Sequence, residues 1–214
     1  MPDEPETSSQ PPTGPTRRPT RRIDARSLRG LAHPLRMSIF EAISLDGPAT
    51  ATGLAERLGA NTGTVSWHLR HLAEHGFIEE ETGRGTKRER WWRRTGVPNE
   101  LNTADFRDDP STRGALSVYL HELVGQYFNR VTDYLNEDWD DGWRAAGTVS
   151  DWHDLRLTPD QLGALNAELM AVIARHTPVP TPADDADVDA DPAALPVVVQ
   201  LQSFPRRARE HGTP

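Results

Sequence analysis

The sequence has 214 residues, of which 36% are apolar and 18 are proline, and it contains no cysteine. This composition predicts one or two domains with a modest apolar core, together with disordered segments that do not belong to that core. The lack of cysteine excludes disulfides and thiolate metal sites. The lack of a membrane-length apolar run or a signal-type stretch predicts a cytoplasmic protein without a membrane partner.

The net charge of −8 is unevenly distributed along the chain. Residues 17–97 hold fifteen basic and nine acidic residues, a balance of +6, whereas the rest holds nine and twenty-three, a balance of −14. A basic block joined to an acidic one suits a protein that binds phosphate with one part only. Because charge runs are also common on solvated faces, this segregation favours a nucleic-acid partner without identifying one.

Residues 1–22 are rich in proline and polar side chains, and we expect them to form a disordered tail. Four arginines precede the first apolar residue of the fold, Ile23: Arg17, Arg18, Arg21 and Arg22. Arginine arms enter the minor groove in some DNA-binding proteins. A solubilising tail is nevertheless the preferred interpretation of this segment.

Two short helices joined by a tight turn are predicted between Thr52 and His75. Thr52 is a suitable N-cap for the first helix, and Gly59 supplies the left-handed residue that ends it. Asn61 caps the second helix, and Gly76 stops it. Three apolar residues recur at i, i+4 and i+7 of the second helix and form its core-facing stripe: Val65, Leu69 and Leu72.

The opposite side of the second helix is predicted to read DNA. At 100° per residue, five residues fall there: Gly63, Ser66, Trp67, Arg70 and Glu74. Short polar and cationic side chains are what a helix in the major groove presents to base edges. His68 lies near the edge of the apolar stripe, so we expect it to be packed or bonded to the backbone.

A hairpin is predicted after the second helix, with strands over residues 77–81 and 88–95. The connecting residues 82–87, TGRGTK, contain two glycines that allow the chain to turn back. Three cations lie at this tip, where they could follow a phosphate backbone: Arg84, Lys87 and Arg88. A helix-turn-helix followed by a charged hairpin is the layout of a winged helix.

Two motifs in this region resemble the winged helix-turn-helix regulators of the ArsR (arsenical-resistance regulator) type. Residues 31–37, LAHPLRM, are similar to that family's opening helix entry, and residues 65–72, VSWHLRHL, resemble its recognition helix. The resemblance covers roughly residues 23–97. It implies a homodimeric, DNA-binding transcriptional regulator, often one that responds to a metal or a small ligand.

The chain departs from the metal-sensing members of that family because it has no thiolate ligand. His68, His71 and His75 share the second helix, but their i, i+3, i+7 spacing points them at different angles, without an obvious partner carboxylate. Structural or phosphate-contacting histidine is the preferred interpretation. We therefore expect neither a metal nor a cofactor.

Residues 98–110 are expected to be a polar linker before a long helix from about residue 112 to residue 136. The helix carries apolar residues on more than one side, namely Leu116, Tyr119, Leu120, Leu123, Val124, Tyr127, Phe128, Val131, Tyr134 and Leu135. At 1.5 Å per residue it spans roughly 37 Å, too long for one small domain to cover. This length predicts packing against a second copy, and thus a homodimer.

The C-terminal region, residues 111–177 and 195–206, is predicted to be a helical dimerisation region, with an effector role left open, and to end in a small strand-helix-strand tail. Residues 149–157 and 195–204 have strand-like patterns. Between them Thr158 can cap a helix whose Gln161 reaches back to the cap. Residues 178–194 are expected to be a disordered acidic loop, since their DxDxD run lacks the glycine and glutamate of a calcium loop.

Aromatic residues of the C-terminal region could line a pocket for a small-molecule effector: Tyr119, Tyr127, Tyr134, Trp139, Trp143 and Trp152. Core packing is the preferred interpretation of such residues. Whether an effector exists therefore stays open.

The sequence as a whole predicts an α+β, mainly helical chain in which a winged helix-turn-helix domain, residues 23–97, precedes a long dimerisation helix and the tail. No nucleophile with its base, metal set or phosphate cradle occurs at usable spacing, so we predict no enzyme. We expect a homodimeric, sequence-specific transcriptional regulator, a repressor in preference to an activator, with helix 62–75 in the major groove of double-stranded DNA and residues 82–88 on the backbone.

The residues expected to contact DNA are Thr62, Thr64, Ser66, Trp67, Arg70, His71, Arg84, Lys87 and Arg88. The rival hypothesis is a winged helix that serves as a protein-interaction module without binding DNA.

Overall fold

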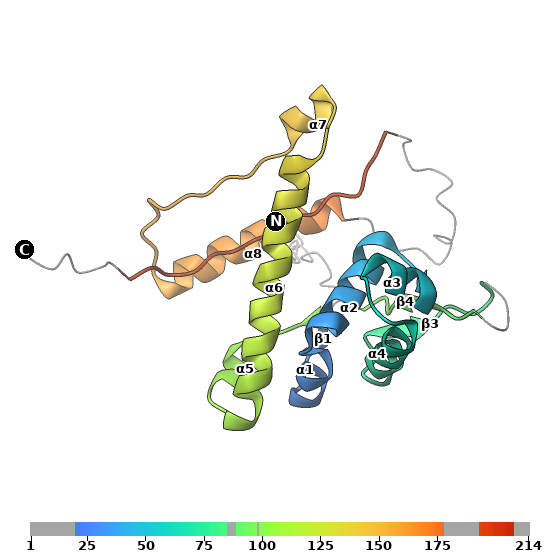
Figure 1. Ribbon diagram of the computed structural model, residues 1–214. Coiled ribbons are helices and arrows are strands. Elements are labelled where there is room, and N and C mark those ends of the chain that lie inside the picture. The colour runs from blue at the N-terminus through green and yellow to red at the C-terminus, as the bar shows by residue number, and fades with distance from the viewer. Residues whose placement is uncertain (1–19, 85–88, 98, 178–192, 208–214) are drawn as a thin grey trace, which may run out of the picture. The chain divides into compact units, whose positions relative to one another are not determined.

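The computed structural model describes residues 20–84, 89–97, 99–177 and 193–207 (Figure 1). The chain divides into two compact units, Met1–Phe128 and Asn129–Pro214. The described part is mainly helical with small sheets, which confirms the predicted fold class. No helix in the described ranges is long and apolar enough to cross a bilayer.

The first unit is built from short helices and strands before the long helix begins. In chain order these are β1 (Arg21–Arg22), α1 (Ala25–Leu31), α2 (Pro34–Asp46), β2 (Ala49–Thr50), α3 (Ala51–Arg57), α4 (Thr62–Glu74), β3 (Ile78–Glu80), β4 (Trp91–Arg94), β5 (Asn99–Glu100) and α5 (Ala104–Arg107). The long helix α6 (Pro110–Asn136) starts in the first unit and ends in the second.

Strands β3 and β4 form the predicted hairpin. They pair antiparallel with Ile78 opposite Arg94 and Glu80 opposite Trp92, and β2 adds to the free side of β4 to complete the order β2-β4-β3. Helices α3 and α4 lie between β2 and the hairpin in the chain and pack on one another. The first unit is therefore a winged helix-turn-helix, as predicted.

The turns around α3 and α4 follow the local rules, with one change of residue. Gly59 and Gly76 adopt positive φ angles of 60° and 67°, and Asn61 caps α4. Helix α3, however, is capped by Thr50 and not by Thr52, because the Gly53 amide donates to Thr50 Oγ1 at 3.2 Å. Thr50 ends β2 in extended backbone, which is the conformation that an N-cap needs, whereas Thr52 already lies inside the helix.

The core of the first unit collects the apolar sides of its helices and the inner face of its hairpin. It consists of Ile23, Leu28, Leu31, Met37, Ile39, Ala42, Ile43, Leu54, Ala55, Val65, Leu69, Leu72, Phe77, Ile78, Trp92, Phe106 and Leu116. The predicted stripe of α4 is fully buried within it. Burial of each such side chain contributes roughly 1.5–3 kcal/mol, so this core fixes the direction in which α4 faces.

The prediction that residues 98–110 form a linker is wrong for residues 99–110, which are the part of this segment that the structure describes. These residues form β5 and α5, and Phe106 is buried in the core. The Thr112 hydroxyl donates to the Phe106 carbonyl at 3.1 Å, which closes this turn onto α6. A single aromatic anchor in a polar run has no periodicity, so the sequence pattern could not reveal it.

The predicted N-terminal tail, residues 1–22, extends too far into the chain, because Arg21 and Arg22 pair with Asn99 and Glu100 in a parallel β1–β5 ladder. Arg22 also binds Asp105 through two contacts, at 2.6 and 2.9 Å. The two residues thus belong to the folded unit. The rest of the expected tail, residues 1–19, lies outside the described residues.

The second unit contains the end of α6, α7 (Asp141–Ala146) and α8 (Pro159–His176). The predicted cap of α8 is confirmed, since the Gln161 amide donates to Thr158 Oγ1 at 3.3 Å and the Thr158 amide donates to Gln161 Oε1 at 2.9 Å. The long helix is confirmed as well, with 27 residues from Pro110 to Asn136. The expected acidic loop falls mostly on residues 178–192, which lie outside the described residues.

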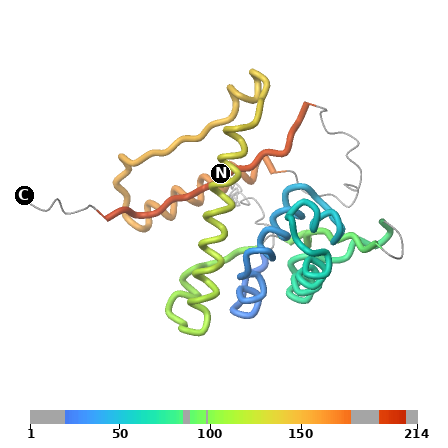
Figure 2. The backbone as a smooth tube through the Cα atoms, in the orientation of Figure 1, coloured from blue at the N-terminus to red at the C-terminus, as the bar shows by residue number. Residues whose placement is uncertain are grey.

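The two predicted strands of the C-terminal tail are wrong for this single chain. Residues 149–157 and 195–204 run extended but belong to neither sheet (Figure 2). The second of them is held by side chains, with Arg130 donating to Gln200 at 2.8 Å and Ser203 donating to Asn166 of α8 at 2.5 Å. A strand needs a backbone partner, and the β-branched pattern of a segment does not supply one.

Candidate nucleic-acid interface

Helix α4 has one buried side and one side open to solvent. Val65, Leu69 and Leu72 are completely inaccessible. The predicted contact residues Thr62, Thr64 and Arg70 are exposed, as is Trp67 with an exposed fraction of 51%, whereas Ser66 and His71 are half-buried. The open side therefore carries hydroxyls near the helix start and a guanidinium further along, which can donate to and accept from base edges.

Both ends of α4 are fixed by side chains. At its start, Asn61 Oδ1 accepts from the Gly63 amide at 2.8 Å and from the Thr64 amide at 3.4 Å. At its end, the Arg21 guanidinium donates to the carbonyls of His75 and Gly76, at 2.5 and 2.7 Å. A cation at a helix C-terminus also interacts favourably with the helix dipole. Sequence reasoning missed this positioning role of Arg21, because 54 residues separate it from His75 in the chain.

The middle of the open side is a flat aromatic surface beside a cation. The rings of Trp67 and His71 stack at a centroid distance of 5.3 Å and an interplanar angle of 10°. Together with Arg70 and Glu74 they line a shallow pocket. Arg70 Nε donates to the Ser66 carbonyl, one turn earlier on α4, at 3.2 Å, and the side chain remains exposed. This arrangement can stack against a sugar or base and donate to an acceptor next to it.

A row of aromatic contacts connects the open side of α4 to the core. His68 is buried, with its ring 4.7 Å from that of His33 and 4.9 Å from that of Trp67. His71 continues the row to His75 at 4.7 Å. The prediction that His68 is packed is therefore confirmed. Within the described residues, the Nδ1 atoms of His33 and His68 have no hydrogen-bond partner.

These histidines are held in a cationic and poorly solvated environment. Burial, followed by the charges of His33 and Arg36, lowers the pKa of His68 to about 4. Burial is also the main cause of the lowered pKa values of His33 and His75. The guanidinium of Arg36 is itself buried and donates to the Arg29 carbonyl at 3.2 Å. At neutral pH the His68 ring is therefore uncharged.

The hairpin is less cationic than its arginines suggest, because glutamates on β3 and just after it face most of them. Three cross-hairpin or local ion pairs are present: Arg93–Glu79 at 2.9 Å, Arg90–Glu80 at 3.8 Å and Arg84–Glu81 at 3.7 Å. Arg84 also lies over the Trp91 ring at 4.1 Å. Sequence reasoning missed these pairs, although the antiparallel register of a predicted hairpin would have placed glutamates and arginines opposite each other.

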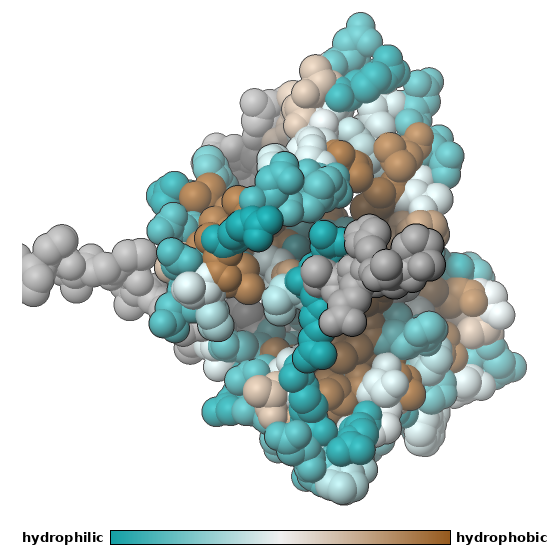
Figure 3. All heavy atoms as spheres, turned by 90° about the vertical axis from the view of Figure 1, so that its left-hand side faces the viewer, coloured by the Kyte–Doolittle hydropathy of each residue, from teal (hydrophilic) through white to brown (hydrophobic). Residues whose placement is uncertain are grey.

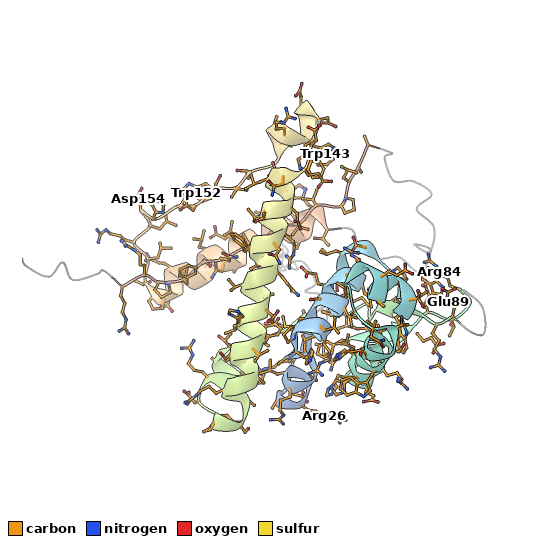
Figure 4. All side chains as sticks on the ribbon, viewed as in Figure 1. Arg26, Arg84, Glu89, Trp143, Trp152 and Asp154 are labelled. Atoms are coloured by element: carbon orange, nitrogen blue, oxygen red, sulfur yellow. The ribbon has the colours of Figure 1, made fainter. Side chains whose placement is uncertain are left out.

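The described hairpin ends at Arg84 on one side and resumes at Glu89 on the other, and their side chains lie at the same end of the hairpin (Figure 4). Arg84 is exposed, as a backbone contact requires. The two other predicted wing contacts, Lys87 and Arg88, lie outside the described residues. The structure thus brings together the α4 candidates on one helix side, and it describes one of the three wing candidates.

The aromatic residues considered for an effector pocket have different surroundings. Trp139 packs on Tyr134 at 5.9 Å and donates from Nε1 to the Tyr134 carbonyl at 3.0 Å, which closes the corner between α6 and α7. Trp152 is 79% exposed on the extended segment. Packing explains the first pair, and an effector stays a prediction.

Comparison with known proteins bears on the helix-turn-helix portion of the chain. Residues 31–81 match the family model described as a helix-turn-helix domain. The curated proteins include no match to this chain. The matched segment runs from the end of α1 to just beyond β3, so it contains α3 and α4 in full.

Solved structures similar to the chain include one described as a winged helix-turn-helix domain and one described as a MarR family regulator. Reduced HlyU from Vibrio cholerae N16961 is 18% identical, with a TM-score of 0.29, covering 46% of this chain and 84% of its own. The homodimeric winged helix-turn-helix DNA-binding domain of Mb0332 from Mycobacterium bovis, a possible ArsR-family regulator, is 21% identical, with a TM-score of 0.31, covering 53% and 81%. NMB1585, a MarR family regulator from Neisseria meningitidis, is 19% identical, with a TM-score of 0.31, covering 67% and 80%.

Proposed function

We propose that the chain is a sequence-specific, DNA-binding transcriptional regulator of the ArsR type, a repressor that acts as a cytoplasmic homodimer. In this proposal α4 enters the major groove of double-stranded DNA, and residues 82–88 at the hairpin tip lie along the backbone. The match of residues 31–81 to a helix-turn-helix domain model supports it.

The observation that carries the proposal is the division of α4 into two sides. The buried stripe holds the helix against the core, and the open side keeps Thr62, Thr64 and Arg70 exposed. Residues near the start of a recognition helix are the ones that reach base edges in helix-turn-helix proteins. Asn61 and Arg21 fix the two ends of α4, so these groups are presented without the entropic cost of ordering the helix on binding.

The proposal is tested by selecting bound fragments from random-sequence duplex DNA and sequencing them. We expect one near-palindromic sequence, with half-sites about one helical turn apart, roughly 34 Å, because a two-fold dimer presents two copies of α4. A full-length chain that enriches no sequence, and that does not bind duplex in dilute buffer, would contradict the proposal.

A protein-interaction module is the second candidate, and the ion pairs of the hairpin favour it. Neutralised arginines attract phosphate less than unpaired ones do, and Arg84, Arg90 and Arg93 each contact a glutamate. The two functions differ in their dependence on salt. Binding to duplex must weaken steeply as salt rises, since counterions are released from the DNA, whereas a mixed-charge protein contact has no such steep linear dependence.

A further inference from the structure

The second unit lacks a core of its own. No described residue from 129 to 177 or from 193 to 207 is buried. Fourteen of the twenty large apolar residues that are exposed in the described chain belong to it: Leu135, Val149, Trp152, Leu155, Leu157, Leu169, Met170, Val172, Leu195, Val197, Val198, Val199, Leu201 and Phe204. Figure 3 shows apolar residues interrupting the hydrophilic surface on the face that it presents.

The backbone of this unit is also incompletely paired. Within the described residues, no backbone hydrogen bond involves residues 149–157, although their side chains make local contacts such as Thr148 with Ser150 and His153 with Asp151. Trp152 and Asp154 mark this extended run in Figure 4. An extended segment with free N–H and C=O groups is a template for pairing with another strand.

Helix α8 is only half covered by its own chain. Leu162, Leu165 and Ile173 are half-buried, while Leu169, Met170 and Val172 remain exposed. The helix therefore carries more apolar surface than the second unit buries. An amphipathic helix whose stripe is not covered needs a further packing partner.

The exposed apolar area matches what a stable dimer buries. Removing one large apolar side chain from water takes away roughly 60–120 Å² when burial is complete. The fourteen residues are between 36% and 79% exposed, so they offer on the order of 800 Å² per chain. A standard interface also buries about 800 Å² per partner.

We propose that the second unit is a dimerisation arm whose apolar face is covered by the second unit of another copy of this chain. Residues 149–157 and 195–204 become strands only there, by pairing with segments of the second copy, and the uncovered side of α8 packs in the same interface. This inference rests on the proposed homodimer and extends it, because it names the two extended segments and the side of α8 that form the contact.

A second copy of the chain fits this apolar surface better than a different protein does. The same unit supplies two extended segments that belong to neither sheet and a helix with surplus apolar surface, so two copies can cover one another about a two-fold axis. A unit with no buried residue also cannot be stable by itself, so its partner must be present whenever the chain folds. Another copy is the partner that synthesis of this chain always supplies.

The first experiment measures amide hydrogen exchange of the full-length chain, together with its mass by sedimentation equilibrium. We expect a mass of twice 23.8 kDa and amides of residues 149–157 that exchange at least 100-fold more slowly than in an unstructured peptide. A mass of one copy, or amides in this segment that exchange at the unstructured rate within the dimer, would overturn the inference.

The second experiment adds a charge to the uncovered side of α8. Val172→Asp should raise the dissociation constant of the dimer at least 100-fold, since the dimer would bury an unpaired carboxylate in each half. Ala171→Asp is the matched control, because it places the same charge on the other side of the same helix, about 160° from Leu169 and about 100° from both Met170 and Val172 at 100° per residue. Equal dissociation constants for the two variants would count against the arm.

The same samples separate this inference from the proposed function. A dimer with protected amides that does not bind duplex DNA supports the arm and contradicts DNA binding. A single-copy protein that still binds duplex DNA overturns the arm and leaves DNA binding standing. The amide measurement needs no variant, so it decides the matter even if Val172→Asp does not fold.

Discussion

The two units of this chain differ in how far they bury their apolar side chains. The first unit buries seventeen apolar residues around α4, whereas no described residue of the second unit is buried. Both contain amphipathic helices and β-branched segments, so sequence pattern does not distinguish them. The difference teaches that a periodic pattern shows which side chains form an apolar face. It does not show whether that face is buried by the same chain or by another one.

The largest expected effect concerns the core that only the first unit has. Leu69→Ala removes a completely buried side chain from α4 and should lower the free energy of unfolding by about 3 kcal/mol, because a cavity remains. Urea denaturation measures this loss. Leu45→Ala, the same change at an exposed position of α2, should cost well under about 1 kcal/mol.

Leu155→Ala in the second unit sharpens the comparison. Its side chain is exposed in the single chain, so a protein that folds without a partner should tolerate the change. We expect instead a loss of stability that grows as the protein is diluted, since the residue would support the contact with a second copy. If Leu69→Ala and Leu155→Ala show the same dependence on protein concentration, the contrast between the units is wrong.

The next effect is a pH dependence that belongs to the first unit. The pKa of His68 is about 4 in the folded chain, against 6.5 for an ordinary histidine. Between these values the unfolded chain binds more protons, so the free energy of unfolding rises with pH. The stability from neutral His68 is complete above pH 6.5 and is lost as the pH falls toward 4, a change of about 3 kcal/mol.

Unfolding by urea at a series of pH values checks this dependence. His68→Gln should flatten the curve between pH 4 and pH 6.5, although His33 and His75 contribute in the same direction because their pKa values are also lowered. His153→Gln in the second unit is the matched control, since it makes the same substitution at an exposed histidine. An identical curve for His68→Gln and the original chain would show that burial of this ring has no such effect.

A smaller effect is expected for recognition of DNA. Arg70→Ala should reduce discrimination between the selected duplex and random duplex by about 1–3 kcal/mol, because the guanidinium is expected to contact a base edge or an adjacent phosphate. Fluorescence anisotropy with the two duplexes measures the ratio. Arg57→Ala, at an exposed arginine paired with Asp46, and Arg175→Ala, on α8, are the matched controls in the two units. Equal losses in all three variants would mean that only total charge matters.

The smallest effect is expected at the hairpin. Lys87→Ala should weaken binding to all duplexes and reduce the slope of affinity against salt by about one ion. Arg84→Ala should weaken it less, by under about 1 kcal/mol, since this arginine already contacts Glu81 and Trp91. Titration over a range of salt concentrations measures both slopes. A larger loss for Arg84→Ala than for Lys87→Ala would show that its ion pair does not restrain it.

Local rules were enough to predict the part of the fold that holds the candidate site. Asn61, Gly59 and Gly76 mark the ends of α3 and α4, and the three-residue stripe of α4 sets which side is buried. Each of these signals acts within one or two helical turns. The exposed candidates on α4 followed directly from that stripe.

Contacts between distant residues account for most of what the sequence pattern missed. Phe106 enters the core from a run without periodicity, and Arg21 reaches α4 from a segment that composition alone assigned to a tail. The glutamates that face Arg90 and Arg93 depend on the register of the hairpin. The failed strands at residues 149–157 and 195–204 depend on a partner that the single chain does not contain.

The attachment of Arg21 to the carbonyls of His75 and Gly76 bears on where this protein can be shortened. A fragment cut to the matched helix-turn-helix segment, residues 31–81, would keep α3 and α4 but lose the guanidinium that satisfies the last turn of α4. A shortened fragment that keeps the end of α4 intact should therefore begin before residue 20 and extend through β5, so that the ladder holding Arg21 in place is retained.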